Sequence, residues 1–207
     1  MHIAILTFDA FNELDSVIAY GMLGRIALLG DTDWRVSIAS PSARVTSMNG
    51  LVIESQIDLQ HACVADAVIV GSGMRTREVV ADEALMTQLR LDPARQLLAA
   101  QCSGTLVLAR LGLLDGVAAC TDLTSKPWVQ EAGVQVLDQP LFARGNVATA
   151  GGCLASTYLA AWVIARLVGL DEARQALHYV APVGEKAQYL AGAMAVIGPY
   201  LQDRIEA

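Results

Sequence analysis

Residues 95–113, ARQLLAAQCSGTLVLARLG, join an apolar strand directly to a helix with an apolar face. The junction is Gln101-Cys102-Ser103-Gly104, so small residues open the helix. In a strand-to-helix turn this tight, the side chain at the apex is lifted out of the sheet, and the first free N–H groups of the helix point towards whatever it attacks. A helix N-terminus favours thiolate over thiol, and only the thiolate is a strong nucleophile. We therefore predict that Cys102 is a reactive cysteine.

Burial in the core is the alternative role for this residue. Free cysteine is among the most buried residue types and usually packs as a small apolar side chain. The same alternative applies to Cys63, Cys120 and Cys153. The position of Cys102 at the end of an apolar strand favours a nucleophile, but an elbow pattern alone leaves both interpretations open.

The composition indicates a globular chain with a large core. Of 207 residues, 54% are hydrophobic and 17% are charged, and no linker, repeat or low-complexity tract interrupts them. We therefore expect a single domain over residues 1–207. The net charge of −7, from 14 basic and 21 acidic residues without a basic stripe, argues against nucleic acid as a partner.

The sequence predicts neither a membrane span nor a metal or cofactor. The most apolar window, residues 154–170, contains Ser156, Thr157 and Arg166 and is too short to cross a bilayer. The start, MHIAILTFDA, lacks a basic region and a cleavage site, so it predicts a strand and, by default, a cytoplasmic location. The irregular spacing of the four cysteines fits neither a disulfide framework nor a zinc motif such as CxxC.

Strands and helices alternate along the chain. Besides the elbow strand, strands are predicted at residues 2–8, 34–40, 45–55 with a turn at Asn49-Gly50, 66–73, 117–122, 134–137 and on both sides of a turn at 144–146. Besides the elbow helix, which ends near Gly112, helices are predicted at about 11–30, 76–91, 124–133, 153–169, 171–178 and 185–204. This alternation predicts an α/β fold whose mainly parallel sheet is covered by helices on both faces.

Polar and glycine residues gather where these strands end. Sites in such folds lie at the carboxyl ends of the strands, and these ends carry residues 9–15, 71–73, 102, 122 and 149–153. Asp15 is either a site residue or an acid that caps or complements the first helix. The loop Gly71-Ser72-Gly73 either turns N–H groups towards an anion or is an ordinary turn.

Four motifs resemble the ThiJ/PfpI superfamily of class I glutamine amidotransferase-like proteins. They are FDAFNELD, IVGSG, QCSGTLVLARLGLLDGVAACTD and TAGGCLAS, and the resemblance covers roughly residues 1–182. It implies a flavodoxin-like three-layer sandwich with a cysteine nucleophile elbow, a small-molecule substrate, and assembly as a homodimer.

Within that superfamily the chain is most similar to the isonitrile hydratase branch. Ser103 is a hydroxyl residue after the cysteine, as in that branch, and the acid near the N-terminus is an aspartate in the context ELDSVIAYGML. The resemblance therefore implies that Cys102, Asp15 and Ser103 do the chemistry. It implies that Gly71, Ser72, Gly73, Gly152, Cys153 and Asp122 bind the substrate or a developing negative charge.

Three departures from the family pattern concern this site. Asp122 stands where those relatives carry histidine, Ser72 replaces the second glycine of the oxyanion loop, and residues 181–184 read APVG in place of the usual tail. The three histidines, His2, His61 and His178, lie off the predicted rim, so a cysteine–histidine pair is not expected unless His178 folds back.

Two functions remain open at this stage. In the hydratase interpretation, Cys102 attacks the isonitrile carbon, Asp15 moves the proton, and the N–H groups of Ser72 and Ser103 stabilise negative charge. In the alternative, Cys102 and Cys153 form a redox-sensing pair without catalysis. A regulator with a DNA-binding domain is disfavoured, because too few residues follow position 182 for a helix-turn-helix pair.

Overall fold

The structure, a computed structural model, describes residues 1–30 and 33–201, in which six strands form one sheet in the order β2-β1-β5-β6-β8-β7. The strands are β1 (His2–Leu6), β2 (Arg35–Ala39), β5 (Ala67–Val70), β6 (Leu97–Gln101), β7 (Leu141–Arg144) and β8 (Val147–Ala150). Neighbouring strands are parallel except for the β7–β8 pair. The prediction of a mainly parallel sheet is confirmed.

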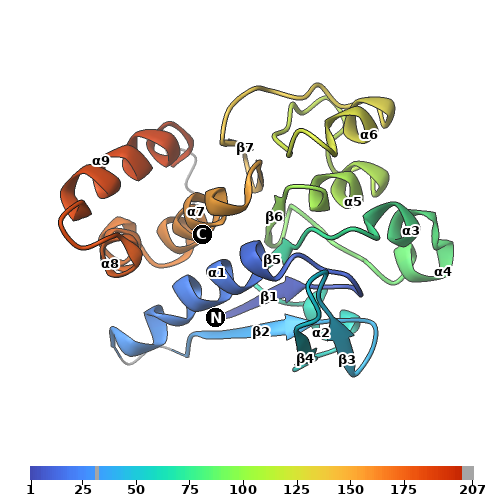
Figure 1. The fold of residues 1–207 in the computed structure, drawn as a ribbon, viewed down its shortest axis with the longest axis horizontal. Helices are drawn as coiled ribbons and strands as arrows, with labels where there is room; N and C mark the ends of the chain where they lie inside the picture. The colour runs from blue at the N-terminus through green and yellow to red at the C-terminus, as the bar shows by residue number, and fades with distance from the viewer. Residues whose placement is uncertain (31–32, 202–207) are drawn as a thin grey trace.

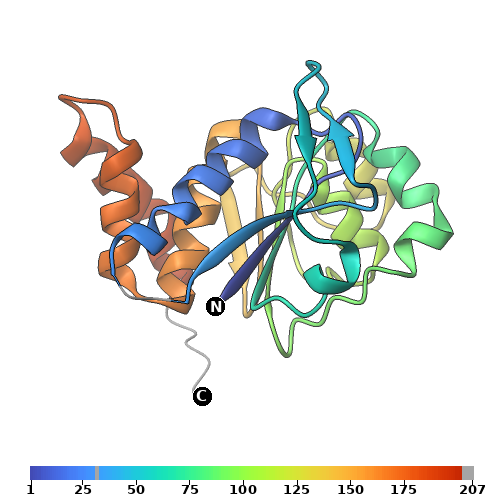
Figure 2. The same cartoon turned by 90° about the horizontal axis from the view of Figure 1, so that it is seen from below.

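Helices cover both faces of this sheet, which gives three layers (Figure 1 and Figure 2). One face packs against α1 (Glu13–Gly24) and α7 (Ser156–Leu167), and α8 (Leu170–Val180) and α9 (Lys186–Ile197) pack on the outer side of these helices. The other face packs against α2 (Leu59–Ala62), α3 (Thr76–Ala81), α4 (Glu83–Met86), α5 (Gly104–Arg110) and α6 (Lys126–Glu131). Ile3 and Ile5 belong to the first core, and Ala4 and Leu6 belong to the second. Successive side chains of a strand point to opposite faces, so an unbroken apolar run fills both cores.

Trp162 is the largest fully buried side chain, and replacing it is expected to destabilise the fold strongly. It lies in α7, is 0% exposed, and its Nε1 donates to the carbonyl of Tyr200 at 3.2 Å. Trp162→Ala removes this contact and leaves a cavity that the core fills only partly, so it should lower the free energy of unfolding by about 3–5 kcal/mol. Denaturant unfolding followed by circular dichroism measures this loss. Trp162→Phe, which keeps most of the buried area, should lose clearly less, and equal losses would contradict the packing argument.

A small hairpin stands at the rim where the parallel strands end. Strands β3 (Arg44–Thr46) and β4 (Val52–Glu54) pair antiparallel around the predicted Asn49-Gly50 turn, in which Gly50 has φ +91°. The N–H of Ala10 donates to Thr46 at 2.7 Å, and the N–H of Met48 donates to Phe11 at 2.8 Å. The hairpin therefore fixes the loop that leads into α1.

Two predicted strands and one predicted helix differ in the structure. Residues 117–122 and 134–137 are irregular and meet only through a bridge between Ala119 and Val136, because this segment lies outside the main sheet. The helix predicted at 76–91 is two short helices, α3 and α4, separated at Asp82. The extended backbone of Asp82, with its side chain accepting from the N–H of Leu85, ends one helix and caps the next.

Helix boundaries near the C-terminus also shift. Residues 153–155 form a 3₁₀ turn before α7 begins at Ser156, and α9 ends at Ile197, followed by a 3₁₀ turn that contains Pro199. Pro199 lacks an N–H group and so favours the end of α9. The last predicted helical residues, 202–204, lie outside the described residues. Across the described residues, no helix combines the length and apolar character needed to cross a membrane.

Candidate active site

Cys102 lies at the apex of a strand-to-helix elbow, as predicted. It follows β6, precedes α5 and has φ +47°, a left-handed conformation that non-glycine residues rarely adopt. Its N–H donates to Ala150 at 2.8 Å, and its carbonyl accepts from the Thr121 hydroxyl at 2.7 Å. The surrounding structure therefore holds a strained residue in place, which is typical of functional sites.

Gly104 is required for the elbow because α5 starts directly against β5. A Cβ atom at this position would lie 2.4 Å from the carbonyl oxygen of Val70 and 2.8 Å from that of Gly71. Both obstacles are backbone atoms, which a side-chain rotation cannot move. Glycine therefore lets the N-terminus of α5 approach the end of β5, where the loop of residues 71–73 begins.

Asp15 is buried in the first turn of α1 and faces the elbow. The N-cap of α1 is Asn12, whose Oδ1 accepts from the N–H of Leu14, so the alternative in which Asp15 caps the helix is wrong. Asp15 is 1% exposed; its Oδ2 accepts from the Ser72 hydroxyl at 2.5 Å and its Oδ1 from the Ser16 hydroxyl at 3.2 Å. Asp15 does lie in the first turn of α1, so the alternative in which its charge complements the helix dipole stays open.

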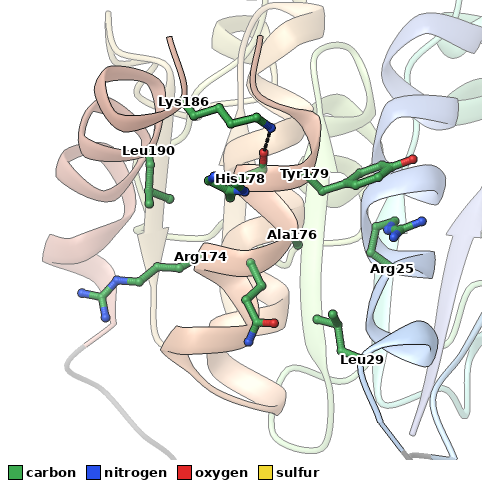
Figure 3. Close-up of a pocket in the computed structure, with 9 residues that line it drawn as sticks. Arg25, Leu29, Arg174, Ala176, His178, Tyr179, Lys186 and Leu190 are labelled. Atoms are coloured by element: carbon green, nitrogen blue, oxygen red, sulfur yellow. Dashed lines mark hydrogen bonds between the residues drawn. The ribbon is translucent and has the colours of Figure 1, made fainter. Parts of the chain in front are cut away.

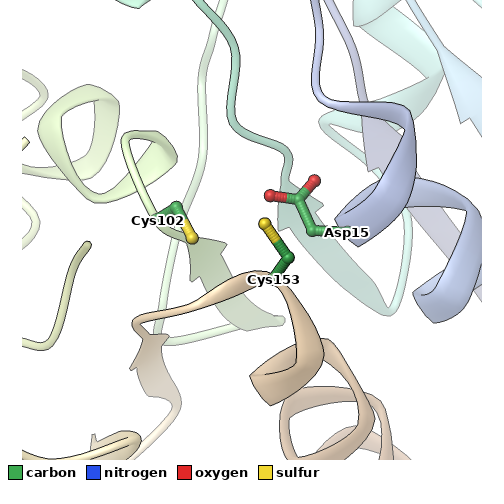
Figure 4. Close-up of side chains that lie close together, drawn as sticks. All are labelled: Asp15, Cys102 and Cys153. Atoms are coloured by element: carbon green, nitrogen blue, oxygen red, sulfur yellow. The ribbon is translucent and has the colours of Figure 1, made fainter. Parts of the chain in front are cut away.

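Asp15, Cys102 and Cys153 form one cluster. One carboxylate oxygen and the two sulfur atoms all lie within 4.8 Å of one another. Figure 4 shows the side chain of Cys153 reaching from the loop before α7 towards both of the others. The sequence placed all three residues on one rim, and the structure brings them together.

Burial controls the ionisation of Asp15 and Cys102. Desolvation raises the pKa of Asp15 to about 6, while the hydrogen bonds from Ser72 and Ser16 act in the opposite direction. Desolvation, and next the charge of Asp15, raise the pKa of Cys102 to about 12; the Gln101 amide and the Gly152 backbone oppose that shift. Near neutral pH, Asp15 is therefore ionised and Cys102 is a protonated thiol, so the expectation that the helix N-terminus favours the thiolate is wrong: burial and the charge of Asp15 outweigh it.

A cavity of about 380 Å³ opens in front of the thiol. Seven of the nine site residues predicted from the sequence line it, and Asp15 and Gly71 do not. The seven are Ser72, Gly73, Cys102, Ser103, Asp122, Gly152 and Cys153. Asn12, Met48, Met74 and Trp128 add amide, thioether and aromatic walls. Leu154, although next to Cys153 in the chain, is 70% exposed and does not line this cavity.

Ser103 and Gly71 support the site in ways that the sequence did not predict. The Ser103 hydroxyl accepts from the N–H of Gly73 at 3.1 Å and bonds with the Thr76 hydroxyl at 2.8 Å. It therefore holds the loop of residues 71–76 beside the cavity. Gly71 lies behind the site, where a Cβ atom would meet the Ser16 hydroxyl oxygen at 2.8 Å. Its small size allows Ser16 to reach Asp15.

Asp122 stabilises a turn and also faces the cavity. Its Oδ1 accepts from the N–H groups of Thr124 at 2.9 Å and Ser125 at 3.0 Å, which fixes the start of the α6 segment. Its charge contributes to the raised pKa of Cys102. At the position where the isonitrile hydratase branch carries histidine, Asp122 thus accepts backbone hydrogen bonds and places a negative charge near Cys102.

The three histidines lie elsewhere in the structure. His2 contacts Ser37, and His61 pairs with Asp58. His178 lies on α8 and lines a separate pocket of about 470 Å³ with Arg25 and Lys186 (Figure 3). His178 does not fold back towards Cys102, so the expectation of a site without histidine is confirmed for these three residues.

Comparison of the sequence with known families gives a match between residues 1–166 and the DJ-1/PfpI family. The chain belongs to that family. It is 27% identical over 175 residues to an isonitrile hydratase from Pseudomonas putida, an alignment that covers 84% of this chain and 75% of that protein.

Solved structures show the same fold as this DJ-1/PfpI chain. A ThiJ/PfpI family protein from Pseudomonas syringae has a TM-score of 0.78 at 19% identity, covering 98% of this chain and 88% of that one. Schizosaccharomyces pombe DJ-1 has a TM-score of 0.75 at 13% identity, covering 88% of this chain and 100% of that one. The flavodoxin-like three-layer fold of this DJ-1/PfpI protein is therefore shown.

Two polar side chains at the sulfur atoms were missed by sequence reasoning. Gln101 Nε2 lies 3.4 Å from Cys102 Sγ and donates to the carbonyl of Gly152 at 2.8 Å. Asn12 Nδ2 lies 3.2 Å from Cys153 Sγ. Asn12 could have been found as the cap residue three positions before Asp15, and Gln101 as a polar residue ending an apolar strand.

Replacing Gln101 is expected to slow the reactions of Cys102. Gln101→Leu removes a donor to the sulfur, and a hydrogen bond to a charged group is worth about 1.5–3 kcal/mol, so the pKa of Cys102 should rise and its alkylation rate fall at least about tenfold. The rate of iodoacetamide modification, followed by mass spectrometry of the Cys102 peptide, measures this. Asp122→Asn removes a neighbouring charge and should speed the same reaction. Changes of the same sign in both variants would contradict this electrostatic account.

Proposed function

We propose that this DJ-1/PfpI protein is a cysteine-dependent hydratase of small molecules, with isonitriles as its substrates. The single observation that carries the proposal is the pairing of a cavity-lining Cys102 with a buried acid, Asp15, in a cluster that contains no histidine. Attack on the terminal carbon of an isonitrile requires a nucleophile, and a proton for that same carbon. A thiol beside a carboxylate supplies both. The similarity to the Pseudomonas putida isonitrile hydratase supports the same choice.

In the first half of the proposed reaction, the sulfur of Cys102 bonds to the isonitrile carbon. The Asp15 carboxylate takes the thiol proton as the S–C bond forms and returns it to the carbon, which gives a thioimidate. The two groups lie within 4.8 Å of each other, which leaves the reacting carbon room to lie between them. Ser72 and Ser16 keep the carboxylate oriented while its proton comes and goes.

In the second half, water adds to the thioimidate carbon. The water oxygen bonds to the carbon, one water proton goes to nitrogen, and the C–S bond breaks to release an N-substituted formamide. The other proton returns through Asp15 to the sulfur, which restores the enzyme. The net reaction converts R–NC and water to the formamide R–NH–CHO. The backbone N–H group of Ser103 at the cavity is the proposed donor to developing negative charge, because the N–H group of Ser72 bonds with the Asp15 carboxylate.

The test is turnover of an aryl isonitrile by the purified protein, followed as formamide by absorbance and chromatography. A Cys63→Ala background removes the other partly exposed thiol outside the cluster, and iodoacetamide then modifies the site. We expect turnover before modification and its loss as the Cys102 peptide becomes alkylated. Absence of formamide from the unmodified protein would sink the proposal for isonitriles.

A redox sensor is the second candidate, favoured by the distance between Cys102 and Cys153. Their sulfur atoms lie within 4.8 Å, so oxidation of one thiol to a sulfenic acid would place it beside a resolving partner. With hydrogen peroxide as the oxidant, the sulfenic acid forms with release of water, and it then condenses with the remaining thiol to a disulfide with loss of a second water. Diamide treatment and thiol counting separate the two functions. A sensor loses both thiols together, whereas a hydratase requires both to remain free during turnover.

A further inference from the structure

Three ligand-type side chains converge on one point from distant parts of the chain. Asp15 comes from α1, Cys102 from the β6–α5 elbow and Cys153 from the turn before α7. Asp15 and Cys102 are buried, and Cys153 is half-buried. Figure 4 shows the carboxylate and both sulfur atoms directed into the space between them. The members of this cluster are far apart in sequence, so no spaced motif such as CxxC marks it.

The spacing of the three atoms suits a small tetrahedral cation. With Zn–S bonds of about 2.3 Å and Zn–O bonds of about 2.0–2.2 Å, neighbouring ligand atoms lie roughly 3.5–3.8 Å apart. The three atoms here lie within 4.8 Å of one another, so side-chain rotations that close them by up to about 1 Å would complete three bonds. Two thiolates with one carboxylate form a donor set that favours zinc and cadmium over magnesium or calcium.

Neighbouring donors already hold each of the three ligands. Gln101 Nε2 lies against Cys102 Sγ, Asn12 Nδ2 lies against Cys153 Sγ, and the Ser72 hydroxyl donates to Asp15. Donors of this kind orient metal ligands and offset the negative charge that two thiolates and a carboxylate bring to one cation. Both cysteines also line the cavity, so a fourth coordination position is open to water.

We propose that Asp15, Cys102 and Cys153 bind one zinc ion per chain, with the fourth position facing the cavity. Each thiol gives its proton to solvent as its sulfur bonds to the metal, and nothing is oxidised or reduced. The bound metal occupies the lone pair with which Cys102 would attack a substrate. Zinc binding and thiol chemistry at Cys102 therefore exclude each other. The metal site does not depend on the isonitrile reaction.

Cadmium is the probe for this site because its bonds to thiolates absorb in the ultraviolet. The reduced full-length protein, freed of metal by a chelator, is titrated with Cd²⁺, and Zn²⁺ is then added in competition. We expect saturation at one cadmium per chain and its displacement by zinc. Cys102→Ala and Cys153→Ala should each weaken binding at least about 100-fold, since even removal of a residue behind a ligand weakens binding by about 10–100-fold. Asp15→Asn should weaken binding while keeping most of the thiolate absorption.

The matched control is Cys63→Ala, because Cys63 lies outside the cluster, against the Gln88 carbonyl and the Arg90 N–H. It should bind cadmium as the unaltered protein does. Zinc should also protect Cys102 from iodoacetamide, a readout that stands even where no isonitrile turns over. Cadmium affinity kept in Cys153→Ala, or lost in Cys63→Ala, would overturn the proposal. Circular dichroism verifies the fold of each variant. If Cys153→Ala does not fold, Cys153→Ser takes its place.

Discussion

Cys102→Ala is expected to lower kcat/KM for isonitrile hydration by at least about 10³-fold, because it removes the only atom that bonds covalently to substrate in the proposed reaction. The elbow places this sulfur at the cavity. Cys153 also lines the cavity, but it lacks the left-handed backbone of the elbow, so we do not expect it to replace Cys102. Initial rates of formamide formation over a range of isonitrile concentrations measure the loss.

Cys63→Ala is the matched control for that experiment. It also removes one thiol but lies outside the cavity, so its rate should equal that of the unaltered protein. Both variants should unfold cooperatively near the same temperature, since Cys102→Ala removes one small atom. If Cys102→Ala kept a rate within tenfold of the control, Cys102 could not be the nucleophile.

Asp15→Asn is expected to lower kcat by about 10²–10⁴-fold, the contribution typical of a positioned acid–base group. An asparagine fills nearly the same space but can neither accept the thiol proton nor return it to carbon. In the unaltered protein, activity should rise with pH through the pKa of Asp15, about 6, because the ionised carboxylate is the form that accepts the thiol proton. Rates from pH 5 to 9 test this, and a rise near pH 6 that persists in Asp15→Asn would contradict the assignment.

The same substitution should make the protein more stable at neutral pH. The pKa of Asp15 is raised from 3.8 to about 6, so between these values the folded state binds more protons than the unfolded state, and stability falls as pH rises through this window. The ionised carboxylate then lowers stability by roughly 3 kcal/mol, at 1.36 kcal/mol per pKa unit. Asp15→Asn removes this pH dependence, which denaturant unfolding at pH 4 and pH 7 would detect. If Asp15→Asn were less stable at pH 7 and its free energy of unfolding still fell between pH 4 and pH 7, this prediction would be wrong.

The sequence by itself determined the sheet, its two cores and the elbow. Unbroken apolar runs such as residues 2–6 and 97–101 are buried on both faces in the structure, and Cys102 stands where the strand pattern meets small helix-opening residues. Asn49-Gly50 forms its hairpin turn because this dipeptide favours positive φ. Each of these features depends on local propensity and periodicity, which a sequence contains.

The polar and glycine residues at the rim could be predicted as a group, because the parallel strands all end at one edge of the sheet. Their hydrogen-bond partners could not be predicted. Ser103 and Asp122 line the cavity as expected, but their hydrogen bonds were not predictable: Ser103 holds the Gly73 loop and Asp122 fixes the turn before α6. A hydroxyl or carboxylate bonds whichever donor lies within about 3 Å, and sequence spacing does not fix distances between loops.

Only the tertiary structure decided how Asp15, Cys102 and Cys153 meet. The residues come from three segments that the fold brings within 4.8 Å, and the pKa values of Asp15 and Cys102 are raised mainly by burial. Desolvation depends on every atom packed around a group, including Gln101 and Asn12, whose roles no motif indicated. Local sequence therefore positioned the nucleophile, while long-range packing set the distances and the dielectric surroundings on which its chemistry depends.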